Sequence, residues 1–195
     1  MRVTPSVLPE VLVIEPQIFG DTRGYFLESW NRTRYRDAGL PETFVQDNLS
    51  KSARGVLRGL HFQQPKAQGK LVTVLDGEVF DVAIDIRVGS PRFGKVATFQ
   101  LSGETKLQVY IPPGFAHGFC VTSESAVFMY KCTELYAPEA EGGVIWNDPD
   151  LGIDWPIDAP LLSAKDTKYA RLRDIDKSRL PVSAEDATKS PGAGR

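Results

Sequence analysis

The sequence predicts an all-β protein, built as a jelly-roll barrel or sandwich with a few short helices at its periphery. The chain has 195 residues, which suits one β domain with one sizeable core. Its clearest pattern is a two-residue alternation of side chains, and Gly, Pro or Ser separates short apolar segments at short intervals. Many short strands joined by turns favour antiparallel sheets over alternating strand-helix units.

One helix and two strands are predicted within the first 62 residues. Residues 31–38 predict a short helix, because Gly39 is placed to end it and Pro41 follows. Residues 44–50 and 56–62 predict the first two strands of the barrel.

A β-hairpin is the best-defined element of the sequence. Residues 71–75 form a short apolar run, and Asp76-Gly77 is a favoured two-residue turn. The strand that follows, residues 80–87, alternates without a break, so that its even and odd positions lie on opposite faces. One face carries Phe80, Val82, Ile84 and Ile86, and the other carries Asp81, Ala83, Asp85 and Arg87.

Four further strands and one helix complete the predicted elements. The strands are residues 95–101, 106–111, 118–121 and 126–133, with Gly, Pro or Ser between them. Ser163 is a candidate cap for a short helix that runs towards Asp174, since Tyr169 and Leu172 recur at helical spacing. No repeat or change of composition divides the chain, so we expect one domain over residues 1–180. Residues 181–195 are polar and predict a loose tail.

The composition excludes several classes of partner. With 23 basic and 25 acidic residues the formal charge is -2, so no global basic field exists to hold a nucleic acid or an anionic membrane. The apolar run at residues 11–14 is too short for a signal peptide, and no segment has the length of a membrane span, so we expect a cytoplasmic protein. The two cysteines, Cys120 and Cys132, are expected to be buried free thiols.

The two histidines of the chain are the first candidates for chemistry, because histidine is the commonest general base. His61 is the better candidate, since it lies on a predicted strand with Arg58. His117 lies in a turn-rich segment and is expected to hydrogen-bond the backbone. A metal centre is disfavoured because the chain has no His-x-His pair, so we expect neither a metal nor another cofactor.

Other polar side chains permit a binding role but do not require it. Arg23 and Arg58 stand beside glycines, and arginine forks suit a diphosphate, although a surface ion pair is the default interpretation of any one arginine. Gln46 and Asn48 share a strand face, and their amides can read a pyrimidine or simply meet water.

Two further candidates lie on predicted strands. Tyr130 shares a strand face with Phe128 and Cys132, so its phenol has largely apolar neighbours, while Lys131 points the other way. Lys70 stands directly before a strand, where lysine is usually exposed.

Six motifs, taken in order, resemble the dTDP-4-dehydrorhamnose 3,5-epimerase family of cupin-like jelly rolls. The resemblance covers about residues 3–174. The motifs are FGDTRGYFLE (19–28), VQDNLS (45–50), GVLRGLHFQ (55–63), GEVFDVAIDIR (77–87), PGFAHGF (113–119) and LLSAKD (161–166).

This resemblance implies roles for the candidates and adds several residues. His61 would be the base, with Asp166 as its carboxylate partner, Tyr130 as the acid on the opposite face of the sugar, and Lys70 as the group that stabilises the enolate. Arg23 and Arg58 would hold the diphosphate. The deoxythymidine part would be surrounded by Gln46, Asn48, Phe19, Phe26, Glu28 and Tyr136. The resemblance also implies a homodimer, because some of these contacts cross between subunits in the family.

The implied reaction is epimerisation of dTDP-4-dehydro-6-deoxy-D-glucose at C3 and C5. Both carbons flank the ketone, so one base can remove either proton if the enolate is stabilised, and no redox cofactor is needed. Three alternatives stay open: an enzyme that inverts only C3 or only C5, a non-catalytic jelly roll that binds a nucleotide sugar, and a metal-dependent jelly-roll oxygenase.

Overall fold

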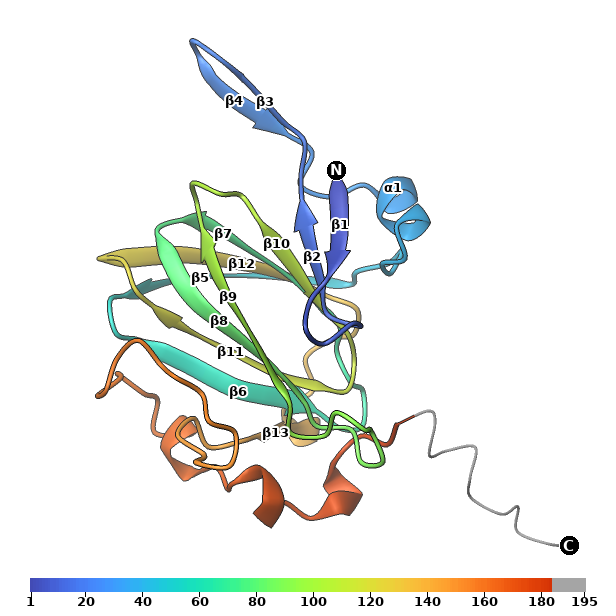
Figure 1. Ribbon diagram of the computed structural model, residues 1–195, viewed down its shortest axis with the longest axis vertical. Helices are drawn as coiled ribbons and strands as arrows, with labels where there is room; N and C mark the ends of the chain where they lie inside the picture. The colour runs from blue at the N-terminus through green and yellow to red at the C-terminus, as the bar shows by residue number, and fades with distance from the viewer. Residues whose placement is uncertain (184–195) are drawn as a thin grey trace, which may run out of the picture.

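Two facing antiparallel sheets form the body of the protein in the computed structural model, which describes residues 1–183 (Figure 1). The six-stranded sheet has the order β1 (Arg2–Pro5), β2 (Leu12–Glu15), β10 (Gln108–Ile111), β7 (Lys70–Asp76), β12 (Ser125–Cys132) and β5 (Gln46–Ala53). The five-stranded sheet has the order β13 (Glu141–Gly143), β6 (Leu57–Gln63), β11 (Phe115–Val121), β8 (Glu78–Asp85) and β9 (Val96–Ser102). This arrangement confirms the predicted all-β jelly roll.

Apolar side chains from both sheets fill the space between them. Val72, Val74 and Phe128 from the six-stranded sheet meet Val79 and Phe119 from the five-stranded sheet in one buried cluster. The rings of Phe119 and Phe128 stack at 4.0 Å between centroids, which joins the two sheets directly.

The predicted hairpin forms as β7 and β8, and the alternation in β8 has a structural explanation. Val82 and Ile84 pack on the outside of the barrel against Leu172 and Leu180 of the C-terminal segment. The opposite face points into the barrel, where Ala83 joins the inner cluster. Both faces of β8 are therefore buried, including its charged face.

The remaining elements are short. Helix α1 (Arg32–Asp37) confirms the predicted helix, and the side chain of Asn31 caps it by accepting from the backbone N–H of Arg34 at 3.1 Å. Within residues 1–183 there are four 3₁₀ turns: η1 (Pro138–Ala140) directly precedes β13, and η2 (Asp166–Lys168), η3 (Leu172–Asp174) and η4 (Lys177–Arg179) follow it.

The predicted helix over residues 163–174 is wrong, because the segment divides into η2 and η3. Between them the backbone pairs with other parts of the chain instead of with itself. The N–H of Ile145 donates to the carbonyl of Ala170 at 2.9 Å, and the N–H of Leu172 donates to the carboxylate of Asp148 at 2.8 Å. These partners replace the i to i−4 bonds of a helix.

Residues 181–183, predicted as the start of a loose tail, are paired with the body of the protein. Val182 forms a parallel bridge with Val88, and the N–H of Ser183 donates to the carbonyl of Val88 at 2.9 Å. The rest of the expected tail, residues 184–195, lies outside the described residues.

A separate hairpin, β3 (Ile18–Asp21) and β4 (Gly24–Leu27), projects away from the barrel at the N-terminal end (Figure 1). It exposes Phe19, Tyr25 and Phe26, each by more than half of its surface. Within residues 1–183, no helix combines the length and the apolar character that crossing a membrane requires.

Candidate active site

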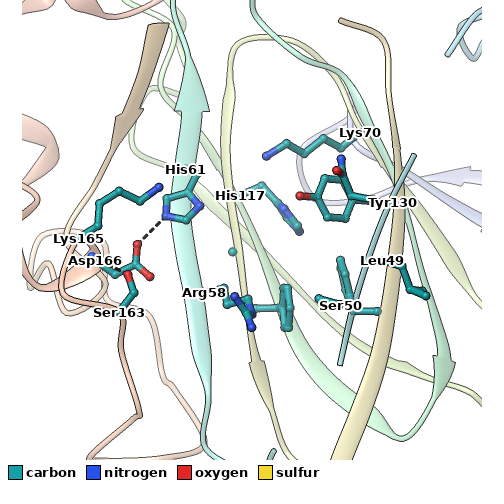
Figure 2. A pocket seen from close by; sticks show the side chains of 14 residues that line it. Leu49, Ser50, Arg58, His61, Lys70, His117, Tyr130, Ser163, Lys165 and Asp166 are labelled. Carbon is teal, nitrogen blue, oxygen red and sulfur yellow. Dashed lines mark hydrogen bonds and ion pairs between the residues drawn. The ribbon is translucent and has the colours of Figure 1, made fainter. Parts of the chain in front are cut away.

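A cavity of about 570 Å³ opens between the two sheets and carries most of the candidate residues (Figure 2). The six-stranded sheet contributes Asn48, Lys70 and Tyr130, the five-stranded sheet contributes Arg58, His61 and His117, and the loop before η2 contributes Ser163 and Lys165, followed by Asp166. An adjoining hollow of about 320 Å³ shares several of these residues and adds Gln46, Tyr136 and Glu141.

His61 and Asp166 form a close pair at one wall of the cavity. The Nε2 atom of His61 lies 2.6 Å from Oδ1 of Asp166, whose side chain is almost completely buried. Burial alone would raise the pKa of Asp166, but the hydrogen bond to His61 and its charge, together with Ser163, hold that pKa below its usual value. The carboxylate therefore stays ionised and accepts the Nε2 proton, which leaves the lone pair of a neutral imidazole on Nδ1.

Tyr130 lies across the cavity from His61 (Figure 2). Strand β12 pairs with β7 in a register that sets Tyr130 opposite Val72 and Cys132 opposite Lys70. Burial, with smaller contributions from Cys132 and Glu141, raises the pKa of Tyr130. The phenol therefore keeps its proton at neutral pH and is able to donate it.

Lys70 reaches the same space from β7. Its Nζ atom lies 5.9 Å from the centroid of the Tyr130 ring. Burial lowers the pKa of Lys70, and the nearby carboxylates of Asp81 and Glu141 oppose that shift. Of the two readings that the sequence allowed for Lys70, an exposed residue at a strand end and a site residue, the structure favours the second, because Lys70 lines the cavity.

His117 differs from its expected backbone-bonded role. Strand β11 sets it directly opposite His61 on β6, and its Nε2 atom lies 2.8 Å from Oδ2 of the fully buried Asp81. The other oxygen of Asp81 has no hydrogen-bond partner among residues 1–183. His117 is thus a cavity residue held by a carboxylate, and the apolar run from Phe115 to Val121 was the available sign of a buried strand.

The binding candidates that reach the cavity form an ordered set of polar groups. The guanidinium of Arg58 donates from Nε and Nη2 to Oγ of Ser52, both at 3.1 Å. The backbone N–H of Tyr136 donates to Gln46 at 2.8 Å, and the Gln46 amide donates to Asn48 at 3.0 Å. Because a backbone N–H only donates, the atom of Gln46 that faces Tyr136 is the amide oxygen, and the Gln46 NH₂ group then faces the amide oxygen of Asn48. The orientation of both side-chain amides is therefore fixed.

Four predicted residues do not reach the cavity of their own chain. Phe19, Arg23 and Phe26 line a shallow hollow on the projecting hairpin, and Arg23 pairs with Asp21 there. Glu28 pairs with Arg34 at 3.3 Å. The structure therefore gathers eight of the twelve predicted residues and leaves these four on or beside the hairpin.

Two charged residues at the site were not predicted. Lys165, next to Asp166, and Glu141, on β13, form a short ion pair at the edge of the cavity. The position of Lys165 beside Asp166 in the LLSAKD motif was the only sequence signal for it. Within residues 1–183, no group of three or more His, Cys, Asp or Glu side chains is arranged to hold a metal ion.

This arrangement suits proton transfer to and from carbon. It places an imidazole with a carboxylate partner on one wall, a protonated phenol on the other, and an ammonium group nearby to stabilise a developing oxyanion. The polar set around Gln46 and Asn48 lies next to these groups and is able to hold the remainder of a larger substrate.

The chain is similar to known proteins over most of its length. Residues 5–174 match the family model for dTDP-4-dehydrorhamnose 3,5-epimerase. The enzyme of that name from Pseudomonas aeruginosa is 56% identical over 178 residues, which cover 90% of this chain and 98% of the relative. The dTDP-4-dehydrorhamnose 3-epimerase of Streptomyces niveus is 41% identical, with 94% of this chain and 90% of the relative covered.

A solved structure is also similar. It is dTDP-6-deoxy-D-glucose-3,5-epimerase from Legionella pneumophila Philadelphia 1 in complex with dTDP-4-keto-L-rhamnose. Its TM-score is 0.91 at 51% identity, with 93% of this chain and 98% of the other covered.

Proposed function

The chain belongs to the dTDP-4-dehydrorhamnose 3,5-epimerase family, and we propose that it converts dTDP-4-dehydro-6-deoxy-D-glucose to dTDP-4-dehydro-L-rhamnose. It is an isomerase, and its reaction belongs to rhamnose biosynthesis. The substrate is inferred from the family, and the observation that carries the reaction type is the His61–Asp166 pair at 2.6 Å, which faces Tyr130 across the cavity.

His61 removes the proton at C3 or C5 with Nδ1, while Asp166 stabilises the imidazolium that forms. The electrons of the broken C–H bond move towards the C4 oxygen, and the ammonium of Lys70 stabilises the resulting enolate. Tyr130 gives its phenolic proton to the opposite face, so the carbon inverts. Solvent then reprotonates the phenolate and takes the proton from His61, which restores both groups for the second carbon. The buried and protonated state of Tyr130 supports this acid role.

The nucleotide part lies along the polar side of the cavity. Arg58 holds the diphosphate, and Gln46, Asn48 and Tyr136 contact the deoxythymidine. Binding through this handle positions the sugar between base and acid and supplies rate enhancement that the reacting groups alone do not.

A second copy of the chain completes the site. The hairpin β3–β4 extends away from its own barrel and exposes Phe19 and Phe26, and an isolated two-stranded hairpin is only marginally stable in water. In a homodimer this hairpin would bring Phe19, Arg23, Phe26 and Glu28 to the nucleotide end of the partner's cavity. The exposed aromatic rings and the guanidinium of Arg23 suit a thymine ring and a diphosphate.

The enzyme is also proposed to work in the cytoplasm without a metal or redox cofactor. Both cysteines are buried and free, as expected from the sequence, and free thiols fit a reducing compartment. The proton transfers described above need no electron acceptor.

The experiment that tests the function follows the substrate by NMR in heavy water, carbon by carbon. The proposal predicts that deuterium enters at both C3 and C5 and that the rhamno product forms. Exchange at one carbon alone would assign a single-position epimerase. Binding of the nucleotide sugar without any exchange would leave only a carbohydrate-binding jelly roll.

A further inference from the structure

The ring of Tyr169 packs against the ring of His61. Their centroids are 5.7 Å apart and the planes meet at 70°, which is an edge-to-face contact. Tyr169 is not among the residues that line the main cavity, so it contacts the imidazole away from the substrate space.

The same short turn carries Tyr169 and Asp166. Turn η2 (Asp166–Lys168) is a 3₁₀ helix, and Tyr169 is its C-terminal cap, three residues after Asp166. Side chains three residues apart in a 3₁₀ helix lie above one another. The same turn therefore supplies two contacts to His61: the carboxylate of Asp166 accepts from Nε2, and the ring of Tyr169 packs against the imidazole ring.

Strand β13 leaves room for this contact. Gly143 pairs with His61 in register, and a Cβ atom at position 143 would lie 2.4 Å from the Tyr169 ring. The backbone bridge between Val144 and Ala170 then fixes the segment that follows Tyr169. The ring is thus held from its own turn, from the adjacent strand and from the backbone bridge.

Tyr169 contacts His61 as a neutral ring. Burial, with the nearby carboxylates of Glu141 and Asp166, raises the pKa of Tyr169 to about 12, although Lys165 opposes the shift. The phenol therefore keeps its proton throughout the range in which an imidazole titrates.

We propose that Tyr169 is a positioning residue, which holds the His61 imidazole in the plane where Nδ1 faces the substrate. A single hydrogen bond to Asp166 leaves the ring free to tilt about the line between Nε2 and Oδ1. Contact with a second rigid group on the side of the ring removes that freedom. The inference rests on the proposed function, in which Nδ1 must point at a C–H bond.

The first test compares Tyr169→Ala with Tyr169→Phe. Tyr169→Ala should lower kcat about tenfold and leave the inhibition constant of dTDP within about twofold, because the nucleotide contacts are elsewhere. Tyr169→Phe should keep kcat within about twofold of the wild type, because the ring and not the hydroxyl makes the contact.

A matched control separates positioning from loss of packing. Leu172→Ala removes a buried side chain three residues further along the same segment, in the cluster under the barrel. An equal loss of kcat in Leu172→Ala and Tyr169→Ala, at similar loss of stability, would overturn the inference. So would a Tyr169→Phe variant as slow as Tyr169→Ala.

A second measurement needs no substrate and so stands apart from the proposed function. ¹³C relaxation of the ring carbons of His61 reports how freely the imidazole moves. The wild type and Tyr169→Phe should show a rigid ring, and Tyr169→Ala should show added motion of the ring, while the hydrogen bond to Asp166 keeps the proton on Nε2 in all three. If the ring is equally rigid in all three proteins, Tyr169 does not position it, even where the exchange experiment has established the epimerase.

Discussion

At the scale of single residues, the site depends on groups that hold fixed protonation states for different physical reasons. Asp166 stays ionised because its hydrogen bonds to His61 and Ser163 and the nearby positive charges together outweigh the effect of its burial on its pKa, and Tyr130 stays protonated because it is buried. Because the two pKa values shift in opposite directions, Asp166 is an anion that orients the base and Tyr130 is a neutral acid on the other wall. This is the pattern expected of an acid–base site.

Lys70 should determine the pH at which kcat/KM falls on the alkaline side of its pH profile. The pKa of Lys70 is lowered from 10.5, so this residue loses its proton at a lower pH than an ordinary lysine does. The pKa of Tyr130 is raised from 10.0, so this residue keeps its proton to a higher pH than an ordinary tyrosine does. Lys70→Arg should move the limb of kcat/KM to higher pH, because a guanidinium stays charged. The rate itself should fall about 10²-fold, because the larger group is displaced from the enolate oxygen.

The control for this prediction is Lys131→Arg. Lys131 lies on the opposite face of β12 and pairs with Asp47 at 2.8 Å. Its replacement should leave the pH profile unchanged. An alkaline limb that stays in place in Lys70→Arg would show that another group loses the controlling proton.

The sequence predicts the base but not its whole surroundings. Histidine is scarce in this chain, which makes His61 a candidate, but a lone histidine on a strand is more often structural, and the role of base followed from the family resemblance. The role of Asp166 followed only from the family resemblance, because 105 positions separate the pair. His117 was misjudged because its partner, Asp81, comes from a different strand, and pairing between strands cannot be read from local sequence.

At the scale of elements, the end of β8 is held by a buried ion pair. The carboxylate of Asp85 is fully buried and accepts from Nε of Arg87 at 2.9 Å and from Oγ of Ser90 at 2.7 Å. Arg87 also lies over the ring of Phe115 at 4.6 Å, at the start of the strand that carries His117. This pair therefore connects the stability of β8 to the placement of β11.

Asp85→Asn should destabilise the protein by about 3 kcal/mol at pH 7, because it removes the buried carboxylate that pairs with Arg87 and leaves Glu10, at 3.0 Å, as the remaining anionic partner of that guanidinium. Burial raises the pKa of Asp85, but Arg87 and Ser90 hold it below its usual value. Since the folded-state pKa is the lower one, this stabilisation is present above about pH 4 and is lost as the pH falls through the folded-state pKa. The difference between wild type and variant in urea unfolding should shrink accordingly.

A suitable comparison is Asp47→Asn, which breaks the pair with Lys131. The Asp47 side chain is about half exposed, so the change should cost less than about 1 kcal/mol. Equal losses for the two variants, or a loss in Asp85→Asn that does not depend on pH, would contradict this account of β8.

The hairpin that could be predicted has buried faces on both of its strands, whereas the short strands β2 and β13 were not predicted. The alternation of residues 80–87 and the Asp76-Gly77 turn predicted β7 and β8, because burial imposes a period on the sequence. Hairpin β3–β4 was missed because nearly all of its side chains are exposed and no period results. The helix expected over residues 163–174 failed because tertiary backbone pairing replaced its internal bonds.

At the scale of the whole molecule, the proposed dimer makes a prediction about mixtures of inactive variants. His61→Asn removes the base, and Arg23→Ala removes a hairpin group. If each site takes its barrel from one chain and its hairpin from the other, a mixed dimer contains one intact site. Refolding the two variants together should restore activity to about a quarter of the sites.

Two measurements test this prediction: the size of the protein by gel filtration and the epimerase activity of the mixture. The wild type should elute as a dimer, and the mixture should regain activity that neither variant has alone. A mixture that stays inactive although mixed dimers form would show that the hairpin serves only its own chain.

The most direct test of the central claim measures hydrogen exchange in His61→Asn. The account predicts that exchange at C3 and C5 falls by about 10³-fold or more, while dTDP binds with nearly wild-type affinity, because the nucleotide contacts lie elsewhere in the cavity. Exchange at the wild-type rate in this variant would show that another group removes the proton.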